Sequence, residues 1–95
     1  MITNNLLLKL KERNSENIIK TRDVLLSMRG KIECLRDLKV EVDIRHGEAS
    51  YDIILITQFD SMEDFDAYLI HPVHTEVSKY IISVLETGAA VCYES

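Results

Sequence analysis

The pattern of apolar and polar residues predicts four β-strands. Leucines at every second position indicate a strand over residues 2–11. Residues 38–45, LKVEVDIR, alternate apolar with charged side chains, so this strand is expected to bury one face, Ile44 included. Residues 51–59, YDIILITQF, are apolar on both faces, which predicts an inner strand covered on both sides. A last strand is expected over residues 89–94.

Between the first two strands the apolar spacing changes to that of a helix. Asn14 and Ser15 are suited to begin it, because their side-chain oxygens can accept hydrogen bonds from its free N–H groups. Gly30 is expected to end it, since glycine readily adopts the left-handed conformation that closes a helix. The apolar stripe of this helix consists of Ile18, Leu25, Met28 and Ile32.

A second helical region is expected between residues 61 and 88, interrupted by a proline. Ser61 is suited to begin it, with Asp64 as its partner three residues later. Pro72 restricts the residue before it to extended geometry, and proline is favoured at the first position of a new helix. The second of the two helices is expected to end at Gly88.

The predicted order is strand, helix, strand, strand, helix, strand. With right-handed crossovers, this order gives an α+β fold of the ferredoxin-like βαββαβ type, in which helices cover one face of a four-stranded antiparallel sheet. Residues 1–95 therefore form a single domain. Because the third strand is apolar on both faces, the open face of the sheet also needs a cover. A second copy of the chain is the simplest cover, which predicts a homodimer.

Composition narrows the class of protein further. The net charge is −5, with no basic stripe, and this argues against a nucleic-acid partner. No segment approaches the roughly 20 consecutive apolar residues that span a bilayer, so no membrane partner is expected. The N-terminal leucines reach a lysine too early for the apolar core of a signal peptide. These features predict a cytoplasmic protein.

The segment 68–74, YLIHPVH, contains the residues best suited to acid–base chemistry. A histidine has an ordinary pKa of about 6.5 and a tyrosine one of about 10. Near neutral pH, His74 can therefore accept a proton from a carbon beside a carbonyl group while Tyr68 donates a hydrogen bond to the carbonyl oxygen. The structural alternative is that Tyr68 packs in the core and a histidine bonds to a helix end freed by Pro72.

A metal site is the third interpretation of the same segment. His71 and His74 are three residues apart, and Asp52, Glu63 or Glu76 could approach them in the fold. The proline between the histidines interrupts the helix that would align them. We therefore expect no metal and no cofactor.

Several stretches together resemble one known family. The most specific is the string F-x-S-x-E-x-x-x-x-Y-x-x-H-P-x-H, and the resemblance extends over essentially the whole chain. It points to the stress-responsive A/B barrel domain, or Dabb, family. The string is carried here by Phe59, Ser61, Glu63, Tyr68, His71, Pro72 and His74.

The resemblance implies a fold, a pocket and candidate residues. Members of the family are dimers whose two sheets face each other in a barrel. One plant relative is a cofactor-free polyketide cyclase that uses the tyrosine and final histidine of the string, in a pocket between helices and sheet. These correspond to Tyr68 and His74, while His71 belongs to the joint between the helices or to the pocket lining. Many relatives have a pocket histidine on the first strand, where this chain has Asn4.

We therefore expect a small homodimeric protein with a small-molecule pocket and an undefined biochemical role. The alternative is a cofactor-independent cyclase or lyase that acts on a small, apolar, polyketide-like carbonyl compound through Tyr68 and His74. A monooxygenase-like activity is a third possibility, suggested by analogy with related dimeric barrels.

Overall fold

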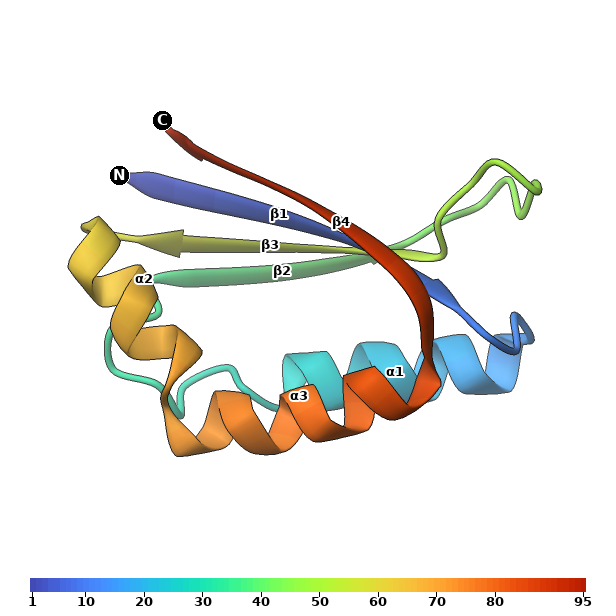
Figure 1. Cartoon of the computed structure of the whole chain (residues 1–95), viewed down its shortest axis with the longest axis horizontal. Helices are drawn as coiled ribbons and strands as arrows, with labels where there is room; N and C mark the ends of the chain where they lie inside the picture. The colour runs from blue at the N-terminus through green and yellow to red at the C-terminus, as the bar shows by residue number, and fades with distance from the viewer.

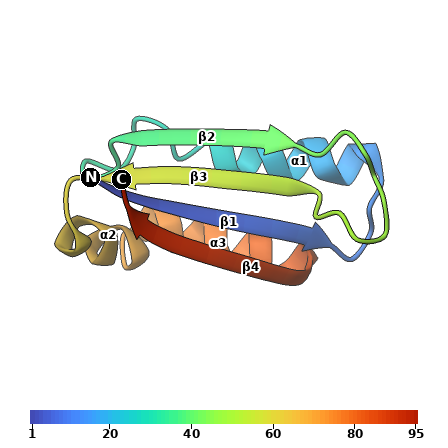
Figure 2. The same ribbon diagram turned by 90° about the horizontal axis from the view of Figure 1, so that it is seen from above.

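Four strands form one antiparallel sheet, and three helices cover one of its faces (Figure 1). The computed structural model describes all 95 residues. The strand order is β2-β3-β1-β4, which Figure 2 shows from the side opposite the helices. The elements in chain order are β1 (Ile2–Leu10), α1 (Ser15–Leu26), β2 (Asp37–Val42), β3 (Ile53–Phe59), α2 (Met62–Leu69), α3 (Pro72–Val84) and β4 (Leu85–Glu94). This confirms the predicted βαββαβ order, with the second helical region divided at Pro72.

The pairing of β1 with β3 decides which side chains face the helices. Leu8 lies opposite Ile53 in the register, and both are buried in the core. Their chain neighbours Leu7 and Ile54 also lie opposite each other, on the open face. On the same face β4 presents Val91, whose side chain is 64% exposed. The open face of a single chain is therefore apolar and uncovered.

The predicted helix beginnings agree with the structure. Asn14 caps α1, because its side-chain oxygen accepts the N–H of Asn17 at 2.8 Å. Ser61 caps α2 in the same way, with its Oγ 3.2 Å from the backbone nitrogen of Asp64. Pro72 occupies the first turn of α3, where its missing N–H costs nothing.

Two predicted ends were wrong by several residues. Helix α1 ends at Leu26 rather than Gly30, which lies in the following turn with a φ of 77°. Strand β2 ends at Val42, and the side chain of Ile44 is 89% exposed instead of buried. The chain turns away there because the Asp43 carboxylate accepts the backbone N–H of the residue three positions later, at 2.6 Å.

Gly88 does not end a helix, which corrects the prediction for the C-terminal part of the chain. Helix α3 ends at Val84, because Leu85 already has extended backbone geometry and begins β4. Gly88 lies within β4 opposite Leu8 of β1. A Cβ atom added there would be 3.3 Å from the carbonyl oxygen of Leu7. The glycine therefore allows a close approach of the two strands.

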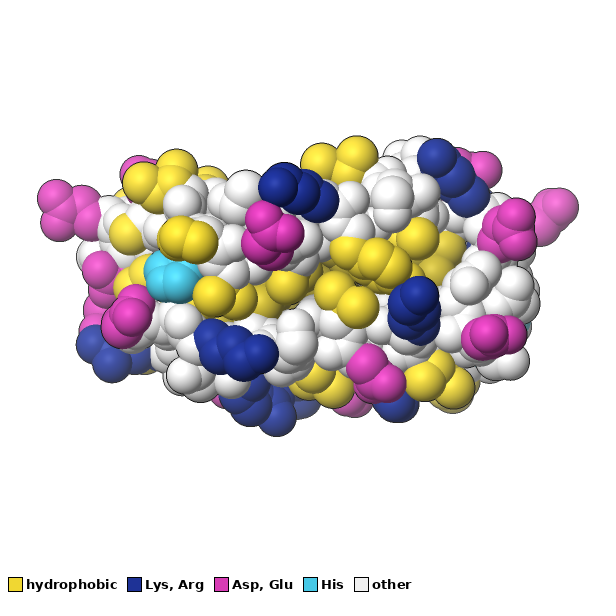
Figure 3. All heavy atoms as spheres, turned by 90° about the horizontal axis from the view of Figure 1, so that it is seen from below, with side chains coloured by type: hydrophobic (Ala, Val, Ile, Leu, Met, Phe, Trp, Pro, Cys, Tyr) yellow, Lys and Arg dark blue, Asp and Glu magenta, His cyan; other side chains and the backbone are white.

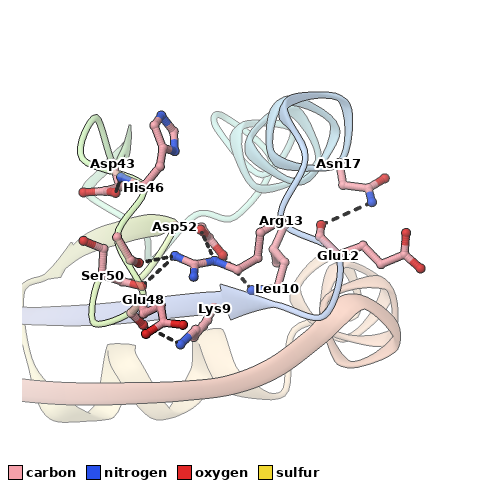
Figure 4. A network of polar contacts seen from close by, with 11 residues as sticks. Lys9, Leu10, Glu12, Arg13, Asn17, Asp43, His46, Glu48, Ser50 and Asp52 are labelled. Atoms are coloured by element: carbon pink, nitrogen blue, oxygen red, sulfur yellow. Dashed lines mark hydrogen bonds and ion pairs between the residues drawn. The ribbon is translucent and has the colours of Figure 1, made fainter.

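An ion pair between half-buried Arg13 and buried Asp52 ties the loop between β2 and β3 to the end of β1 (Figure 4). Asp52 is 1% exposed; one of its oxygens accepts the N–H of Leu10 at 2.8 Å, and the other lies 3.0 Å from Arg13 Nε. Arg13 also donates to the carbonyl oxygens of Gly47 and Ser50, both at 2.9 Å. Four hydrogen bonds thus depend on one carboxylate and one guanidinium group.

None of the helices combines the length and the apolar character that crossing a lipid bilayer requires.

We predict that Asp52→Ala lowers the free energy of unfolding by about 2–4 kcal/mol, because it leaves buried donors unpaired. Urea unfolding measures the change. Asp60→Ala is the matched control, since Asp60 forms an exposed ion pair with Arg36 at 2.8 Å. Loss of that exposed pair should cost less than about 1 kcal/mol. Equal losses in the two variants would contradict the role assigned to the buried pair.

Candidate functional site

A cavity of about 390 Å³ lies between the helices and the covered face of the sheet. Figure 3 shows the helix side, where hydrophobic side chains gather along the middle of the face between flanks of charged ones. No Asp, Glu, Lys or Arg lines the cavity. The lining consists of Asn4, Leu6, Leu25, Met28, Leu55, Phe65, Tyr68, Leu69, His74, Val77, Ser78, Ile81 and Ala90.

Tyr68 reaches the cavity from α2, near the end of that helix. Its ring packs on Phe59, with the two ring centroids 5.0 Å apart, and its side chain is only 3% exposed. Burial raises the pKa of Tyr68 above its ordinary value of 10.0. The phenol is therefore protonated at neutral pH. Its hydroxyl donates only to Met28 Sδ at 3.8 Å, a weak acceptor, so the hydroxyl is available to a ligand oxygen.

His74 lies in the first turns of α3, with its ring 4.3 Å from that of Tyr68 between centroids. Its Nδ1 lies 3.1 Å from the carbonyl oxygen of Leu69. A carbonyl can only accept, so Nδ1 carries the hydrogen and Nε2 has the free lone pair. Burial lowers the pKa of His74 below its ordinary value of 6.5, and the hydrogen bond to the Leu69 carbonyl opposes this shift only in part. At neutral pH the imidazole is therefore an uncharged base.

Ser78 is a polar residue of the cavity that the sequence motif does not include. Its Oγ lies 3.4 Å from Nε2 of His74. The two residues are four apart in α3, so they occupy the same face of the helix. The i, i+4 spacing was the one sequence signal that could have identified Ser78.

Asn4 and His71 occupy different surroundings. Asn4 lines the cavity from β1, and its side chain makes no hydrogen bond within the protein. His71 lies outside the cavity lining, at the joint between α2 and α3. There its Nδ1 accepts the N–H of Val73 at 3.1 Å, and its Nε2 lies 3.5 Å from a carboxylate oxygen of Glu33. The side chain of His71 thus caps α3.

The residues considered for a metal site are dispersed. No three His, Cys, Asp or Glu side chains are gathered in a way that could hold a metal ion. Asp52 directly precedes β3, and the start of β3 lies at the other end of the sheet from the start of α3 (Figure 1). Arg13 and a backbone N–H occupy the oxygens of Asp52. The donors near His74 are instead a phenol, a hydroxyl and an amide, which suit an organic ligand.

Comparison with known proteins supports the fold and the family. The profile of a family described as Stress responsive A/B Barrel Domain matches residues 2–95. Among curated proteins, none matches this sequence.

Solved structures of similar shape cover nearly the whole chain. A dimeric protein of unknown function with a ferredoxin-like fold, from Bacteroides fragilis, is 25% identical, with a TM-score of 0.84 over 99% of this chain and 95% of that one. A dimeric ferredoxin-like protein of unknown function from Thermobifida fusca is 20% identical, with a TM-score of 0.85 over 99% and 90%. A hydroxynitrile lyase from Passiflora edulis is 16% identical, with a TM-score of 0.80 over 97% and 90%.

The lowered pKa of His74 predicts a dependence of stability on pH. Below about pH 6.5 the unfolded chain takes up a proton that the folded histidine resists, so the free energy of unfolding falls as the pH decreases. We expect His74→Asn to make the slope between pH 7 and pH 5 shallower, by at most about 1.4 kcal/mol per pH unit. Urea titrations at one fixed protein concentration measure this slope.

The matched substitution is His46→Asn, which removes an exposed histidine from the turn after β2. If the His46 variant changes the slope as much as the His74 variant does, the effect does not arise in the cavity.

Proposed function

Because the chain belongs to the stress-responsive A/B barrel domain family, we propose that it works as a homodimer that binds a small, largely apolar molecule in the cavity between helices and sheet. The observation that carries this proposal is the composition of the cavity wall. Ten of its 13 lining residues are hydrophobic, and none carries a formal charge at neutral pH. An apolar pocket with a few polar groups is the usual form of a small-molecule site.

The polar groups of the cavity also support a second candidate, a cofactor-independent lyase or cyclase. Leu69 holds Nδ1 of His74, so that Nε2 is oriented as a base. Tyr68 stands beside it with a protonated hydroxyl. His74 would take the proton from a hydroxyl or from a carbon beside a carbonyl group, while Tyr68 stabilises the oxygen with a hydrogen bond. The similarity to the hydroxynitrile lyase supports the fold for this chemistry and nothing finer.

The apolar open face of the sheet supports the homodimer. Leu7, Ile54 and Ile56 line it within the central strands, and Val91 extends it onto β4. Contiguous exposed apolar surface of this kind is typical of protein interfaces. The similar proteins from Bacteroides fragilis and Thermobifida fusca are both described as dimeric. A second sheet packed on this face would cover it, as α1 and α3 cover the opposite face.

We predict that acetophenone, a small apolar ketone, binds in the cavity and that Ala90→Phe abolishes its binding. Ala90 lines the cavity from β4, so a phenyl ring there fills the space. Chemical-shift changes in ¹H–¹⁵N spectra during titration measure the affinity. Ala67→Phe is the control, because Ala67 is exposed on α2 and does not line the cavity. Equal binding of acetophenone by both variants would contradict the proposed pocket.

Turnover distinguishes the binding protein from the enzyme. The wild-type protein and its variants are incubated with mandelonitrile, a small aromatic cyanohydrin. An enzyme transfers the hydroxyl proton to His74, breaks the carbon–carbon bond to cyanide, and returns the proton from His74 to the cyanide, which releases benzaldehyde and hydrogen cyanide. Benzaldehyde formation that disappears in Tyr68→Phe and in His74→Asn supports the lyase. Binding without any benzaldehyde above the protein-free rate supports the binding role alone.

We predict that Val91→Lys converts the dimer to a monomer, because it places a charge on the apolar open face of each copy. Light scattering at micromolar concentration measures the mass. The control is Ile82→Lys, which changes a similarly exposed residue on α3: Ile82 is 71% exposed and Val91 is 64% exposed. A monomeric wild-type chain, or a Val91 variant that is still dimeric, would contradict an interface on the open face.

A further inference from the structure

A polar pair lies on the sheet side of the cavity, apart from the helix residues that form the candidate site. Asn4 on β1 and Thr57 on β3 are directly opposite each other in the register, on the side that faces the helices. The pairs on either side of them are apolar. Leu6 lies opposite Leu55, and Ile2 opposite Phe59. Two polar side chains thus interrupt an otherwise apolar layer.

The side chains of Asn4 and Thr57 both have hydrogen-bonding groups without a partner in the protein. Thr57 is 0% exposed, and its Oγ1 is the one buried side-chain polar atom in the chain without a partner. A buried hydroxyl left unpaired is costly, so a nearby acceptor should satisfy it. Asn4 faces the cavity, makes no hydrogen bond within the protein, and offers one acceptor oxygen and two donor hydrogens.

We propose that Asn4 binds the oxygen of a neutral carbonyl ligand and that Thr57 positions the Asn4 amide for this. The inference rests on the proposed small-molecule function of the cavity. Cβ atoms of directly opposite residues are about 4.5–5.5 Å apart, so a rotation of the Asn4 side chain brings its Oδ1 within reach of the Thr57 hydroxyl. With Oδ1 held by Thr57, the NH₂ group points into the cavity as a donor.

The remaining polar groups of the cavity favour the same class of ligand. Tyr68 presents a protonated hydroxyl. Together with the Asn4 amide, it offers hydrogen-bond donors to a ligand that accepts. A carboxylate ligand would lose its hydration without meeting a cation, since no lysine or arginine lines the cavity. A ketone, an aldehyde or an ester on an apolar body therefore fits best.

Three aromatic probes of nearly the same shape test the role of Asn4: acetophenone, ethylbenzene and benzoate. We expect the wild type to bind acetophenone and to exclude benzoate. In Asn4→Leu the ratio of the ethylbenzene to the acetophenone dissociation constant should fall by about tenfold, the upper range for one hydrogen bond. Asn5→Leu is the control, because Asn5 faces the open side of the sheet.

The side-chain NH₂ resonances of Asn4 give a readout that a purely structural role would not change. They are identified by their absence in Asn4→Leu. We expect acetophenone to shift them and ethylbenzene to leave them in place. In Thr57→Val, which keeps the volume and removes the hydroxyl, the shift and the ketone preference should both disappear while the chain stays folded. Thr57→Ser retains the hydroxyl and should restore both.

The outcomes separate this inference from the proposed function. If the wild type binds neither acetophenone nor ethylbenzene, the pocket and the role of Asn4 both fall. If both probes bind and their ratio is the same in the wild type and in Asn4→Leu, the pocket stands and the inference is overturned. A ketone preference that persists in Thr57→Val overturns the positioning role of Thr57.

Discussion

The pairing of β1 with β3 is the constraint on which the remaining structure depends. Both strands lie inside the sheet, so a shift of one residue in their register would exchange every side chain between the two faces. The observed register places Leu8 and Ile53 under the helices and Leu7 and Ile54 on the open face. It also sets Asn4 at the wall of the cavity. The cavity and the apolar open face are thus two consequences of the same ladder of hydrogen bonds.

The break before Pro72 determines the geometry of the site on the helix side. A continuous helix would use the Leu69 carbonyl oxygen within its own ladder. Because α2 ends at Leu69, this carbonyl is free to accept the Nδ1–H of His74 from the next helix. The same break places the rings of Tyr68 and His74 in contact, although they belong to different helices. The proline joint therefore creates the orientation of the imidazole as well as the turn.

Residue patterns were sufficient for the fold but only for part of the site. Tyr68 and His74 lie in a dense local motif, so the sequence could identify them as candidates. Ser78 was missed although it follows His74 at helical spacing. Thr57 was missed because the register of β1 and β3, which places it opposite Asn4, cannot be seen in the sequence. The predicted helix ends were wrong where they rested on a glycine, because glycine also occurs in turns and where two strands approach closely. Gly88 was assigned to a helix end because sequence alone does not show the approach of β1.

The proposed binding role accounts for the polar pair of Asn4 and Thr57. An apolar residue at position 57 would pack against Leu38 and its other neighbours without an unpaired hydroxyl, so the polar side chain lowers stability. A chain of 95 residues has a small core and little stability in reserve. The proposed dimer would offer compensation, because association of two copies on the open face would bury further apolar surface. On these proposals the interface would stabilise a fold whose covered side is kept partly polar for a ligand.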